Sequence, residues 1–505
     1  MADQENRRSA FCAGEMEISK PINITSLDKR DYDAVVVGSG PNGLSAAILL
    51  QQAGLSVLLV EAKDTVGGGL RSAELTLPGF THDICSAIHP LAALSPFMSS
   101  LPLAQHGLQF IEPAVPAAHP LDDGSAALLK KDFNETASLL GKDAEAYRQL
   151  MNTLVNNWPQ LAGDILGPLH FPSHPVLMAK FGLNALQPAT WLAQKFSTQQ
   201  AKALLAGMAA HAIQPLSNTA TSAIAMVLMA AGHLRGWPLP LGGTASIATA
   251  LSAYFLSLGG KIETNNYVQS INQLPSAHAL LLDVTPRQLL QMAGHRLSSV
   301  YKWQLQRYRY GMGVFKIDWA LDAPIPFVAE GCRLAGTVHL GNSMKEIVQS
   351  EQLTADGAYV DKPFVLLAQP SVFDATRAPV AKHTAWAYCH TPNGSTRDMT
   401  AAIENQVERF APGFKETILA RHTMNTAEME AYNPNYIGGD INGGVIDIRQ
   451  LFTRPALRWS PYRTSAKGIY ICSSSTPPGG GVHGMCGYHA ARKALEEVFS
   501  IKVNL

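Results

Sequence analysis

The sequence predicts an α/β fold built on a parallel sheet, and three features of the 505-residue chain lead to this prediction. An apolar strand, a glycine-rich turn and a helix follow one another near residue 40. The same order recurs near the other end, where TPPGGGVHGMCGYHAAR (476–492) follows the apolar run 468–472. Hydrophobic residues make up 47% of the chain, which is ample for a large core, and the length favours more than one domain.

The first element is DYDAVVVGSGPNGLSAAILLQQAGLSVLLVEA (31–62). Its run 34–37 does not alternate between apolar and polar residues, as expected for a parallel strand buried on both faces. The spacing G-x-G-x-x-G then allows a tight turn, close approach of the backbone to a pyrophosphate, and close packing of helix on strand. The helix N-terminus offers free N–H groups to the phosphates. The predicted phosphate-binding residues are Gly38, Ser39, Gly40, Pro41, Asn42 and Gly43.

The next strand, 56–60, ends at Glu61, whose carboxylate is placed to accept hydrogen bonds from an adenosine ribose. Because the strand, the helix and the acid occur in the order and at the spacing of the motif, the sequence predicts a Rossmann-type dinucleotide-binding domain. A purely structural glycine turn is the alternative.

The segment AKDTVGGGLRSAEL (62–75) bears on which dinucleotide is bound. A second diglycine just beyond the acidic residue resembles an element of FAD-dependent oxidases and desaturases. The arginine usual after that diglycine is replaced by Gly69, and Arg71 is expected to take over its charge. A surface loop is the alternative. The residues predicted to contact FAD here are Ala62, Gly67, Gly68, Gly69 and Arg71.

The glycine loop near residue 480 lies between a predicted strand, 468–472, and a helix from about Gly484 onward. In flavoproteins with two dinucleotide-binding domains, such a C-terminal helix faces the pyrimidine end of the isoalloxazine, where its dipole stabilises negative charge on reduced flavin. This resemblance implies that the two ends of the chain meet around one FAD. The residues assigned to the flavin ring are Gly480, Gly481, Val482 and Met485.

The sequence as a whole resembles the phytoene dehydrogenase and carotenoid isomerase-like flavoproteins from residue 31 onward. The resembling stretches include HDICSAIHPLAALSPF (82–97), GWPLPLGGTASIATAL (236–251), LLLDVTPRQLL (280–290), YRYGMGVFKIDWALDAPIP (308–326) and YNPNYIGGDINGG (432–444). The resemblance implies an amine-oxidase/desaturase-like fold: a Rossmann-type FAD-binding domain with an inserted α+β substrate domain on a mixed sheet, plus an apolar helical cap.

By this resemblance the FAD-binding domain is discontinuous. A strand in its second part is expected to place Val268 against adenine. The implied segments are a flexible tail, 1–30; the FAD-binding parts 31–115, 236–300 and 445–505; and the substrate-domain parts 116–235, which carries the helical cap, and 301–444.

The apolar stretch 171–234 has only three charges, Lys180, Lys195 and Lys202. Three interpretations stay open: an ordinary buried helical subdomain, a cap over a lipophilic substrate tunnel, and an interfacial membrane patch.

Two residues are candidates for catalysis. Lys316 in GMGVFKIDWAL resembles the amine-oxidase lysine that holds a water at flavin N5, and pairing with Asp318 is its alternative. His483 lies within the last glycine loop and could exchange a proton or donate to flavin, or it could cap the helix. Tyr388, Cys389 and His390 are expected on an interior strand and not in a site. Asp440 and Asn442 are expected in a turn near the cofactor.

Composition excludes some classes of partner and site. The formal net charge is zero and no long charged run occurs, so nothing favours nucleic acid. The six cysteines are scattered without C-x-x-C, so we expect no metal site and a reducing compartment. Residues 1–30 lack the apolar core of a secretory signal, and no apolar run reaches the roughly 18 residues that span a bilayer. We expect a cytoplasmic protein that is not secreted, or a mitochondrial matrix protein if the source is a eukaryote, with peripheral membrane contact left open.

The leading hypothesis is an FAD-dependent oxidoreductase that desaturates or isomerises a lipophilic small molecule by hydride transfer to flavin. A flavin amine oxidase is the first alternative, although GGGVHGM lacks the aromatic residue common in those enzymes at this point. An FAD-binding regulatory protein with little turnover is the second. The oligomeric state is left open.

Overall fold

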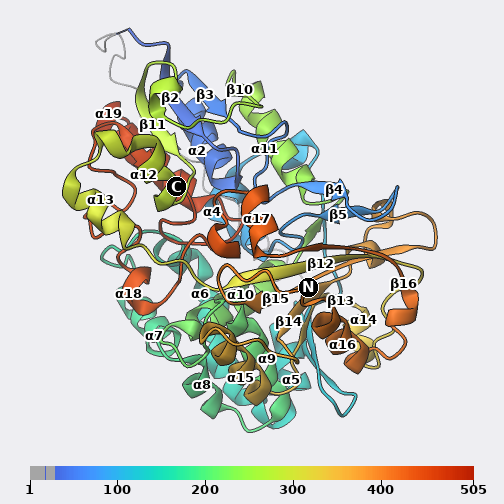
Figure 1. The fold of residues 1–505 in the computed structure, drawn as a ribbon. Coiled ribbons are helices and arrows are strands. Elements are labelled where there is room, and N and C mark those ends of the chain that lie inside the picture. The colour runs from blue at the N-terminus through green and yellow to red at the C-terminus, as the bar shows by residue number, and fades with distance from the viewer. Residues whose placement is uncertain (1–16, 19–28, 505) are drawn as a thin grey trace.

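The computed structural model describes residues 17–18 and 29–504. The predicted tail 1–30 therefore lies almost wholly outside the described residues, as does Cys12. Figure 1 shows two sheets, one above the other, with helices gathered on the lower side. The predicted α/β architecture, a parallel Rossmann-type sheet joined to a second, mixed sheet, is confirmed.

The upper sheet has five strands in the order β10-β3-β2-β11-β17, and every neighbouring pair is parallel. Its strands come from three distant parts of the chain, so both ends of the sequence meet in one sheet. They are β10 (Lys261–Glu263), β3 (Val57–Val60), β2 (Tyr32–Val37), β11 (Ala277–Leu282) and β17 (Ile469–Ile471).

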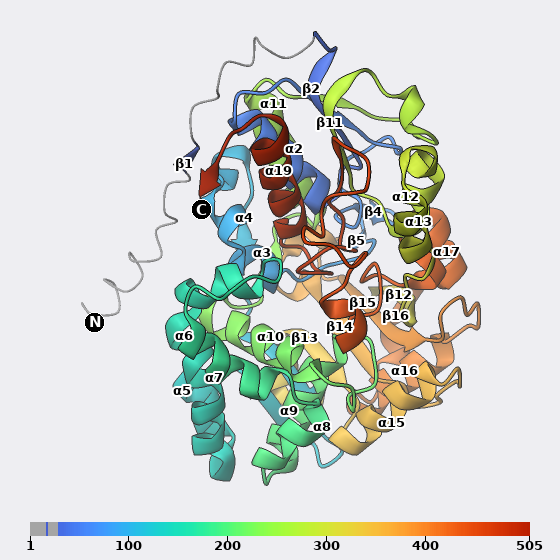
Figure 2. The ribbon, with the colours of Figure 1, turned by 90° about the vertical axis from the view of Figure 1, so that its left-hand side faces the viewer.

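Helices cover both faces of this sheet, which explains why β2 does not alternate. Ala34 and Val36 pack in the core shared with α2, α11 and α19, whereas Val35 and Val37 pack with α12 and α13. These helices are α2 (Pro41–Gln52), α11 (Ala245–Ser257), α12 (Pro286–Ala293), α13 (Ser299–Gln306) and α19 (Met485–Val498). Figure 2 shows α2 and α19 side by side at the top.

The lower sheet has seven strands in the order β16-β12-β15-β14-β13-β7-β8. It is mixed, because β13 and β7 run parallel and the other neighbours are antiparallel. Its strands are β16 (Ile418–Met424), β12 (Gly313–Leu321), β15 (His383–Thr391), β14 (Val365–Ala368), β13 (Ala335–Leu340), β7 (Val115–Pro120) and β8 (Ala126–Leu129).

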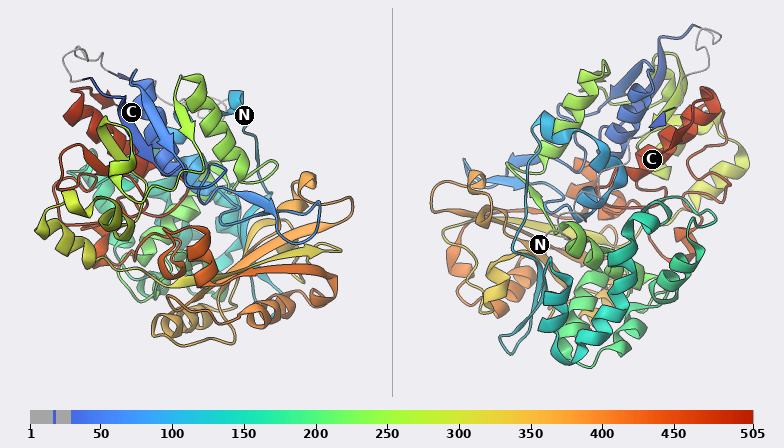
Figure 3. Two further views of the ribbon diagram at one scale, coloured as in Figure 1. Left: turned by 45° about the horizontal axis from the view of Figure 1, so that its top comes forward. Right: turned by 180° about the vertical axis from the view of Figure 1, so that it is seen from behind.

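One face of the seven-stranded sheet packs on α16 (Thr400–Phe410) in a separate apolar core. That helix lies on the side away from the five-stranded sheet (Figures 1 and 3). Other helices that follow strands of this sheet are α14 (Glu330–Arg333), α15 (Met344–Ala355) and α17 (Thr426–Tyr432), and α18 (Ile448–Leu451) lies nearer the chain end.

The segment 133–235 forms the helical part of the molecule, at the bottom of Figure 2. Helices α9 and α10 are almost wholly buried, whereas α7 exposes much of its apolar surface. These helices are α5 (Phe133–Leu139), α6 (Ala144–Ile165), α7 (Pro175–Ala185), α8 (Ala189–Leu192), α9 (Gln199–Ala210) and α10 (Thr221–Arg235). Within the described ranges no helix is both long and apolar enough to cross a membrane.

Short elements complete the fold. The chain end pairs antiparallel with the segment 17–18 through β18 (Val503–Asn504) and β1 (Glu17–Ile18). The others are β4 (Ser72–Glu74), β5 (Thr81–Asp83), β6 (Phe110–Ile111), β9 (Leu239–Pro240), α3 (Pro90–Leu94) and α4 (Pro96–Ser100).

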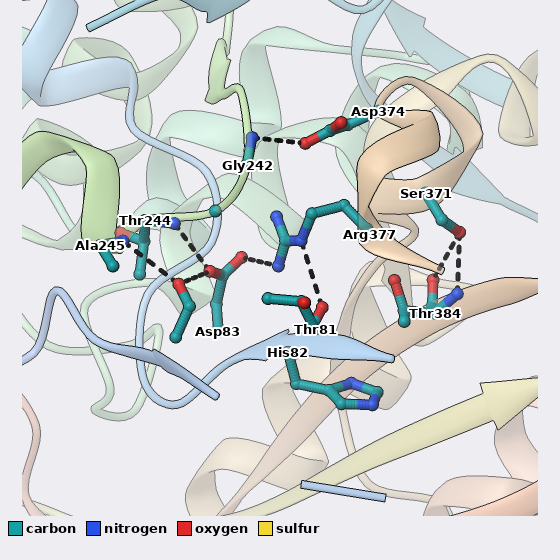
Figure 4. Close-up of polar contacts among 12 residues, drawn as sticks. Thr81, His82, Asp83, Gly242, Thr244, Ala245, Ser371, Asp374, Arg377 and Thr384 are labelled. Carbon is teal, nitrogen blue, oxygen red and sulfur yellow. Dashed lines mark hydrogen bonds and ion pairs between the residues drawn. The ribbon is translucent and has the colours of Figure 1, made fainter. Parts of the chain in front are cut away.

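A buried ion pair joins three parts of the chain between the sheets. Arg377 binds Asp83 at 2.7 Å and donates to the carbonyl of Thr81 at 3.1 Å (Figure 4). The other oxygen of Asp83 accepts from the Thr244 N–H at 2.8 Å, and Asp374 accepts from the Gly242 N–H at 2.8 Å. The charged groups are buried, and their hydrogen bonds connect the segment 374–377 to the segments 81–83 and 242–244. We infer that this network holds the mixed sheet in place against the dinucleotide-binding part.

Candidate functional site

One cavity of about 670 Å³ is lined by residues of both sheets. One part of it lies at the carboxyl ends of β2, β3, β11 and β17, where ligands bind in open parallel sheets. The other part is lined by the mixed sheet and the helical region. The residues of that second part are His211, Leu228, Trp237, Thr337, Leu366, Trp386 and Tyr388.

Most of the residues predicted to bind the cofactor line this cavity. They are Gly38, Ser39, Gly40, Pro41, Asn42, Glu61, Ala62, Gly68, Gly69, Arg71, Val268, Gly481 and Val482. One detail of the prediction is wrong, because the strand before Val268 ends at Glu263 and Val268 lies in the irregular segment that follows. A three-residue strand with two exposed residues is too short to reach that position.

Four of the predicted residues do not line this cavity. A Cβ on Gly43 would overlap the carbonyl oxygen of Gly38, which is the close helix–strand packing that the motif spacing predicts. A Cβ on Gly67 would lie 2.7 Å from the Leu70 oxygen, and one on Gly480 2.7 Å from Oδ1 of Asn442. Met485, the first residue of α19, lines a second cavity of about 940 Å³ beside that helix.

Glu61 ties the two N-terminal glycine elements together. Its Oε2 accepts from the Ser39 N–H at 3.0 Å, and its Oε1 accepts from the Lys63 N–H at 2.9 Å and from Arg71 at 3.1 Å. The side chain lies at the cavity wall, as a ribose-binding acid must. Its contact with a ribose stays a prediction.

Arg71 is also held from several sides. Besides Glu61 it donates to the carbonyls of Thr65, at 2.6 Å, and Gly68, at 3.1 Å. Its charge therefore stabilises the loop that carries the second diglycine. Its role toward a phosphate stays a prediction.

Asp283 is a residue that the sequence reasoning missed. Its Oδ2 accepts from the Gly43 N–H at 3.0 Å, at the N-terminus of α2, and a Cβ on Gly40 would lie 2.9 Å from the same oxygen. Burial, together with the negative charge of Glu61, raises the pKa of Asp283 to about 7. The carboxyl group is thus close to half protonated at neutral pH, which reduces repulsion of an anion at this helix terminus. Its position directly after the apolar run of β11 was the available signal.

His483 is buried, and both of its ring nitrogens are occupied within its own loop. Nδ1 accepts from the Met485 N–H at 3.0 Å, and Nε2 lies 3.2 Å from the Gly479 carbonyl oxygen. Burial lowers the pKa of His483 to about 4, so the ring is neutral. These contacts are those of the helix-capping alternative. Proton exchange by His483 stays a prediction.

Lys316 lies on β12, buried, and forms an ion pair with Asp318 two residues further along the same face. Asp318 also faces His82 at 3.8 Å and His422 at 3.7 Å. This is the pairing of the alternative interpretation. Lys316 is not among the cavity-lining residues, so its catalytic role stays a prediction without a cavity contact to support it.

The mixed-sheet part of the site contains residues that the sequence reasoning placed elsewhere. Tyr388 does lie on an interior strand, β15, as expected, yet its side chain lines the cavity together with Trp386. Asn442, which was expected in a turn near the cofactor, also lines the cavity, from the glycine turn after Asp440. The alternation in HTAWAYCHT was the signal, since every second side chain of a strand faces the same way.

The dinucleotide part has the character of an FAD site. A Cβ on Gly68 would lie 2.9 Å from Cα of Gly40, so the two loops approach as only glycines allow. The buried Oδ1 of Asn42 has no hydrogen-bond partner at the cavity wall. The glycine cradle and the helix terminus fit the diphosphate of a dinucleotide such as FAD.

This fold and site define a dinucleotide-binding oxidoreductase with a Rossmann-type domain, and comparison with known proteins agrees. Residues 36–100 match the family model of the NAD(P)-binding Rossmann-like domain. Over 93% of its length the chain is 27% identical to pyridine nucleotide-disulfide oxidoreductase domain-containing protein 2 of Mus musculus, covering 94% of that protein.

A second relative is the lycopene-forming phytoene desaturase of Pseudescherichia vulneris, 22% identical over 91% of this chain and 98% of that protein. Among solved structures, a putrescine oxidase redesigned in its cofactor binding superimposes with a TM-score of 0.59 at 18% identity, over 92% of this chain and 98% of that one. At such identity the superposition shows the fold alone. The two relatives in sequence confirm the resemblance to the phytoene dehydrogenase-like proteins.

Proposed function

We propose that the protein is an FAD-dependent oxidoreductase that dehydrogenates or isomerises a predominantly hydrophobic small molecule. The observation that carries this proposal is a single cavity with glycine loops and a helix terminus in one part and Leu228, Trp237, Leu366 and Trp386 in the other. FAD, when bound, would supply the oxidising power by accepting a hydride.

The residues of the chain contribute binding, orientation and exclusion of water. The N-terminus of α2 and the two diglycine elements would hold the diphosphate. Gly481 and Val482 would border the ring, and the first turn of α19 is fixed by His483. Aromatic and aliphatic side chains of the mixed sheet and α10 would orient the substrate. They also exclude water from the reacting region.

The experiment is anaerobic reduction of the purified, FAD-loaded protein. Individual polyenes, isoprenoid lipids and fractions of a lipid extract are added, loss of the visible flavin absorbance is followed, and products are identified by mass. Bleaching with a product two hydrogens lighter supports dehydrogenation, and a product of unchanged mass supports isomerisation. If no hydrophobic compound bleaches or turns over, this function is rejected.

The amine-oxidase alternative is less well supported by the site. Of the cavity-lining residues that the structure describes, the only acids are Glu61 and Asp283, both in the dinucleotide part. A substrate ammonium would find no carboxylate in the mixed-sheet part. Rapid peroxide release in air with monoamines or polyamines would reverse this ranking.

A regulatory role would instead be indicated if a variant that binds FAD but accepts no electrons rescued the loss of the gene.

We further propose that the helical region touches a lipid surface through apolar side chains near α7, from which a lipophilic substrate could be taken. Phe171 is 84% exposed, Leu183 74% and Trp191 64%. The charges of 171–234 are all lysines, which suits an anionic surface. Phe171→Ser and Leu183→Ser should reduce co-sedimentation with vesicles containing phosphatidylglycerol. Val380→Ser, an exposed apolar position outside this region, is the control. Equal sedimentation of all variants would refute the contact.

A further inference from the structure

Two arginine side chains are almost completely buried, and they differ in what balances their charge. Arg377 and Arg454 are each 1% exposed. Arg377 forms an ion pair with Asp83 at 2.7 Å. Within the described ranges, no aspartate or glutamate oxygen lies within 4.0 Å of the nitrogens of Arg454. Because a buried charge without a counter-charge is strongly unfavourable, the place of Arg454 needs an explanation beyond packing.

Arg454 is held by the loop that follows β17. Its Nη2 donates to the carbonyl of Ser474 at 2.8 Å, and its Nε donates to the carbonyl of Ser475 at 3.3 Å. Nη2 also donates to the Tyr308 hydroxyl at 3.1 Å, which in turn donates to the Gly443 carbonyl at 2.8 Å. All of these acceptors are uncharged. They fix the position of the guanidinium group, but its full positive charge remains.

This charge lies directly behind the loop predicted to border the flavin ring. Ser474, which accepts from Arg454, itself lines the cavity, and so do Gly481 and Val482 further along the same loop. A Cβ on Gly479 would lie 3.3 Å from Nη1 of Arg454. Arg454 is not among the cavity-lining residues. The guanidinium group is therefore one residue away from the cavity, on the protein side of its wall.

The titratable groups around Arg454 do not cancel its charge. Burial raises the pKa of Tyr308 and raises that of Cys486 to about 11, so both are neutral at pH 7. His483, with a pKa of about 4, is neutral as well. Burial also raises the pKa of Asp440, and the charge of Arg454 opposes that rise. Asp440 offsets Arg454 only in part, because the two lie further apart than an ion pair and the carboxylate accepts from backbone N–H groups at 2.8 Å.

We propose that Arg454 stabilises the reduced form of bound FAD through its charge and thereby makes the flavin a stronger hydride acceptor. Acceptance of a hydride leaves one negative charge on the ring system. In a buried region a positive charge several ångströms away favours that negative charge more than it would in water. The N-terminus of α19 adds a partial charge of the same sign. Since Arg454 acts from behind the loop, it is a positioning residue and not a catalytic one. This inference rests on the proposed function in placing the ring end of FAD at the last glycine loop.

The test measures the reduction potential of FAD in the loaded protein, anaerobically, against reference dyes and without any substrate. Arg454→Gln removes the charge but keeps N–H groups that can donate to the Ser474 carbonyl. It should lower the equilibrium constant for two-electron reduction about tenfold, which is a shift of about 30 mV to lower potential. Arg454→Lys keeps the charge and should recover most of the potential. Arg458→Gln is the matched control: it removes the same charge from the same segment, where Arg458 is half-buried against the ring of Tyr301, and should leave the potential unchanged.

Sulfite provides a second measurement that needs no substrate. Its sulfur atom bonds to N5 of oxidised flavin, and the electron pair that forms this bond leaves a negative charge on the ring system, with loss of the visible absorbance. The FAD-loaded natural chain should form this adduct. Arg454→Gln should bind sulfite about tenfold more weakly, because the same charge is then less stabilised, and Arg458→Gln should bind it as the natural chain does.

Equal potentials for the natural chain and Arg454→Gln overturn the proposal, as does an equal shift in Arg458→Gln. A loss in Arg454→Lys as large as that in Arg454→Gln also overturns it, because hydrogen bonding and not charge would then decide. If Arg454→Gln does not fold, sulfite decides on the natural chain: an adduct supports the proposal, and its absence overturns it. The potential could depend on Arg454 while no hydrophobic compound reduces the flavin; in that case this inference stands and the proposed function fails. A chain that binds no FAD rejects both.

Discussion

The backbone of Gly487 in α19 lies directly against the backbone of Asn42 in α2, where a Cβ on Gly487 would overlap the Asn42 carbonyl oxygen. Gly484, the residue before α19, lies against the side chain of Ser45 in α2, where a Cβ on Gly484 would overlap the Ser45 hydroxyl oxygen. The two glycine-rich segments from opposite ends of the sequence are therefore in contact. The closeness of α2 and α19 fixes the distance between the predicted diphosphate and flavin-ring ends of the site.

Gly487→Ala should destabilise the protein and weaken FAD retention. The added methyl group must push the two helices apart, and such overpacking costs about 1–3 kcal/mol. Thermal unfolding and the flavin-to-protein absorbance ratio measure the two effects. Gly182→Ala in α7 is the control, because nothing lies within 4 Å of a Cβ there and the exchange should be neutral or stabilising. Equal melting of Gly487→Ala and the natural chain would show that the helices can separate freely.

Arg377→Met should lower stability more than any exchange in an exposed ion pair. The substitution leaves Asp83 buried without its counter-charge, which typically costs about 3–5 kcal/mol. Lys382→Met removes the exposed partner of Asp322, and an exposed pair contributes at most about 1 kcal/mol. Urea unfolding of both variants provides the comparison. Similar losses for the two would mean that the network in Figure 4 does not hold the sheets together.

Asp283→Asn should stabilise the protein increasingly as the pH rises. The carboxyl group has a pKa of about 7 when folded and 3.8 as its ordinary value, so the folded state binds more protons between these limits. Stability of the natural chain therefore falls as pH rises from 4 to 7, relative to the asparagine variant. The difference should be small at pH 4 and on the order of 4 kcal/mol at pH 8. Urea unfolding across this range measures it, and a pH-independent difference would contradict the assignment.

The parallel sheet could be predicted because its signals are local. In β2 and β3 the run of apolar residues and the glycine spacing lie within a few residues of each other, and backbone geometry alone explains the spacing. Local signs predicted the last strand–loop–helix, whereas its place in the same sheet as the first strand was implied by the resemblance to flavoproteins with two dinucleotide-binding domains. The error at Val268 arose where no local rule specifies how far a short edge strand extends.

The mixed-sheet end of the site could not be predicted in the same way. Thr337 and Trp386 are about 50 residues apart in sequence and come together only through the register of three strands. Asp283 meets the first glycine loop by pairing of β11 with β2, across some 240 residues. Alternation along β15 shows that Trp386 and Tyr388 share a face, but which face borders the cavity is decided by packing on α16.

Two exchanges of His483 separate helix capping from proton exchange. His483→Ala removes the acceptor for the Met485 N–H and should cost about 1 kcal/mol of stability, as for other lost caps. His483→Asn can accept from an N–H two residues further on and should recover most of this loss. With a folded pKa of about 4, below the ordinary 6.5, the histidine favours unfolding as pH falls through this interval, and both variants should lose that dependence. If capping is the whole role, asparagine also restores the rate of flavin reduction and its pH profile. The other outcome is an asparagine variant that melts like the natural chain while its flavin is reduced slowly and the rate no longer changes with pH on one side of its optimum. In that case the ring exchanges a proton during turnover.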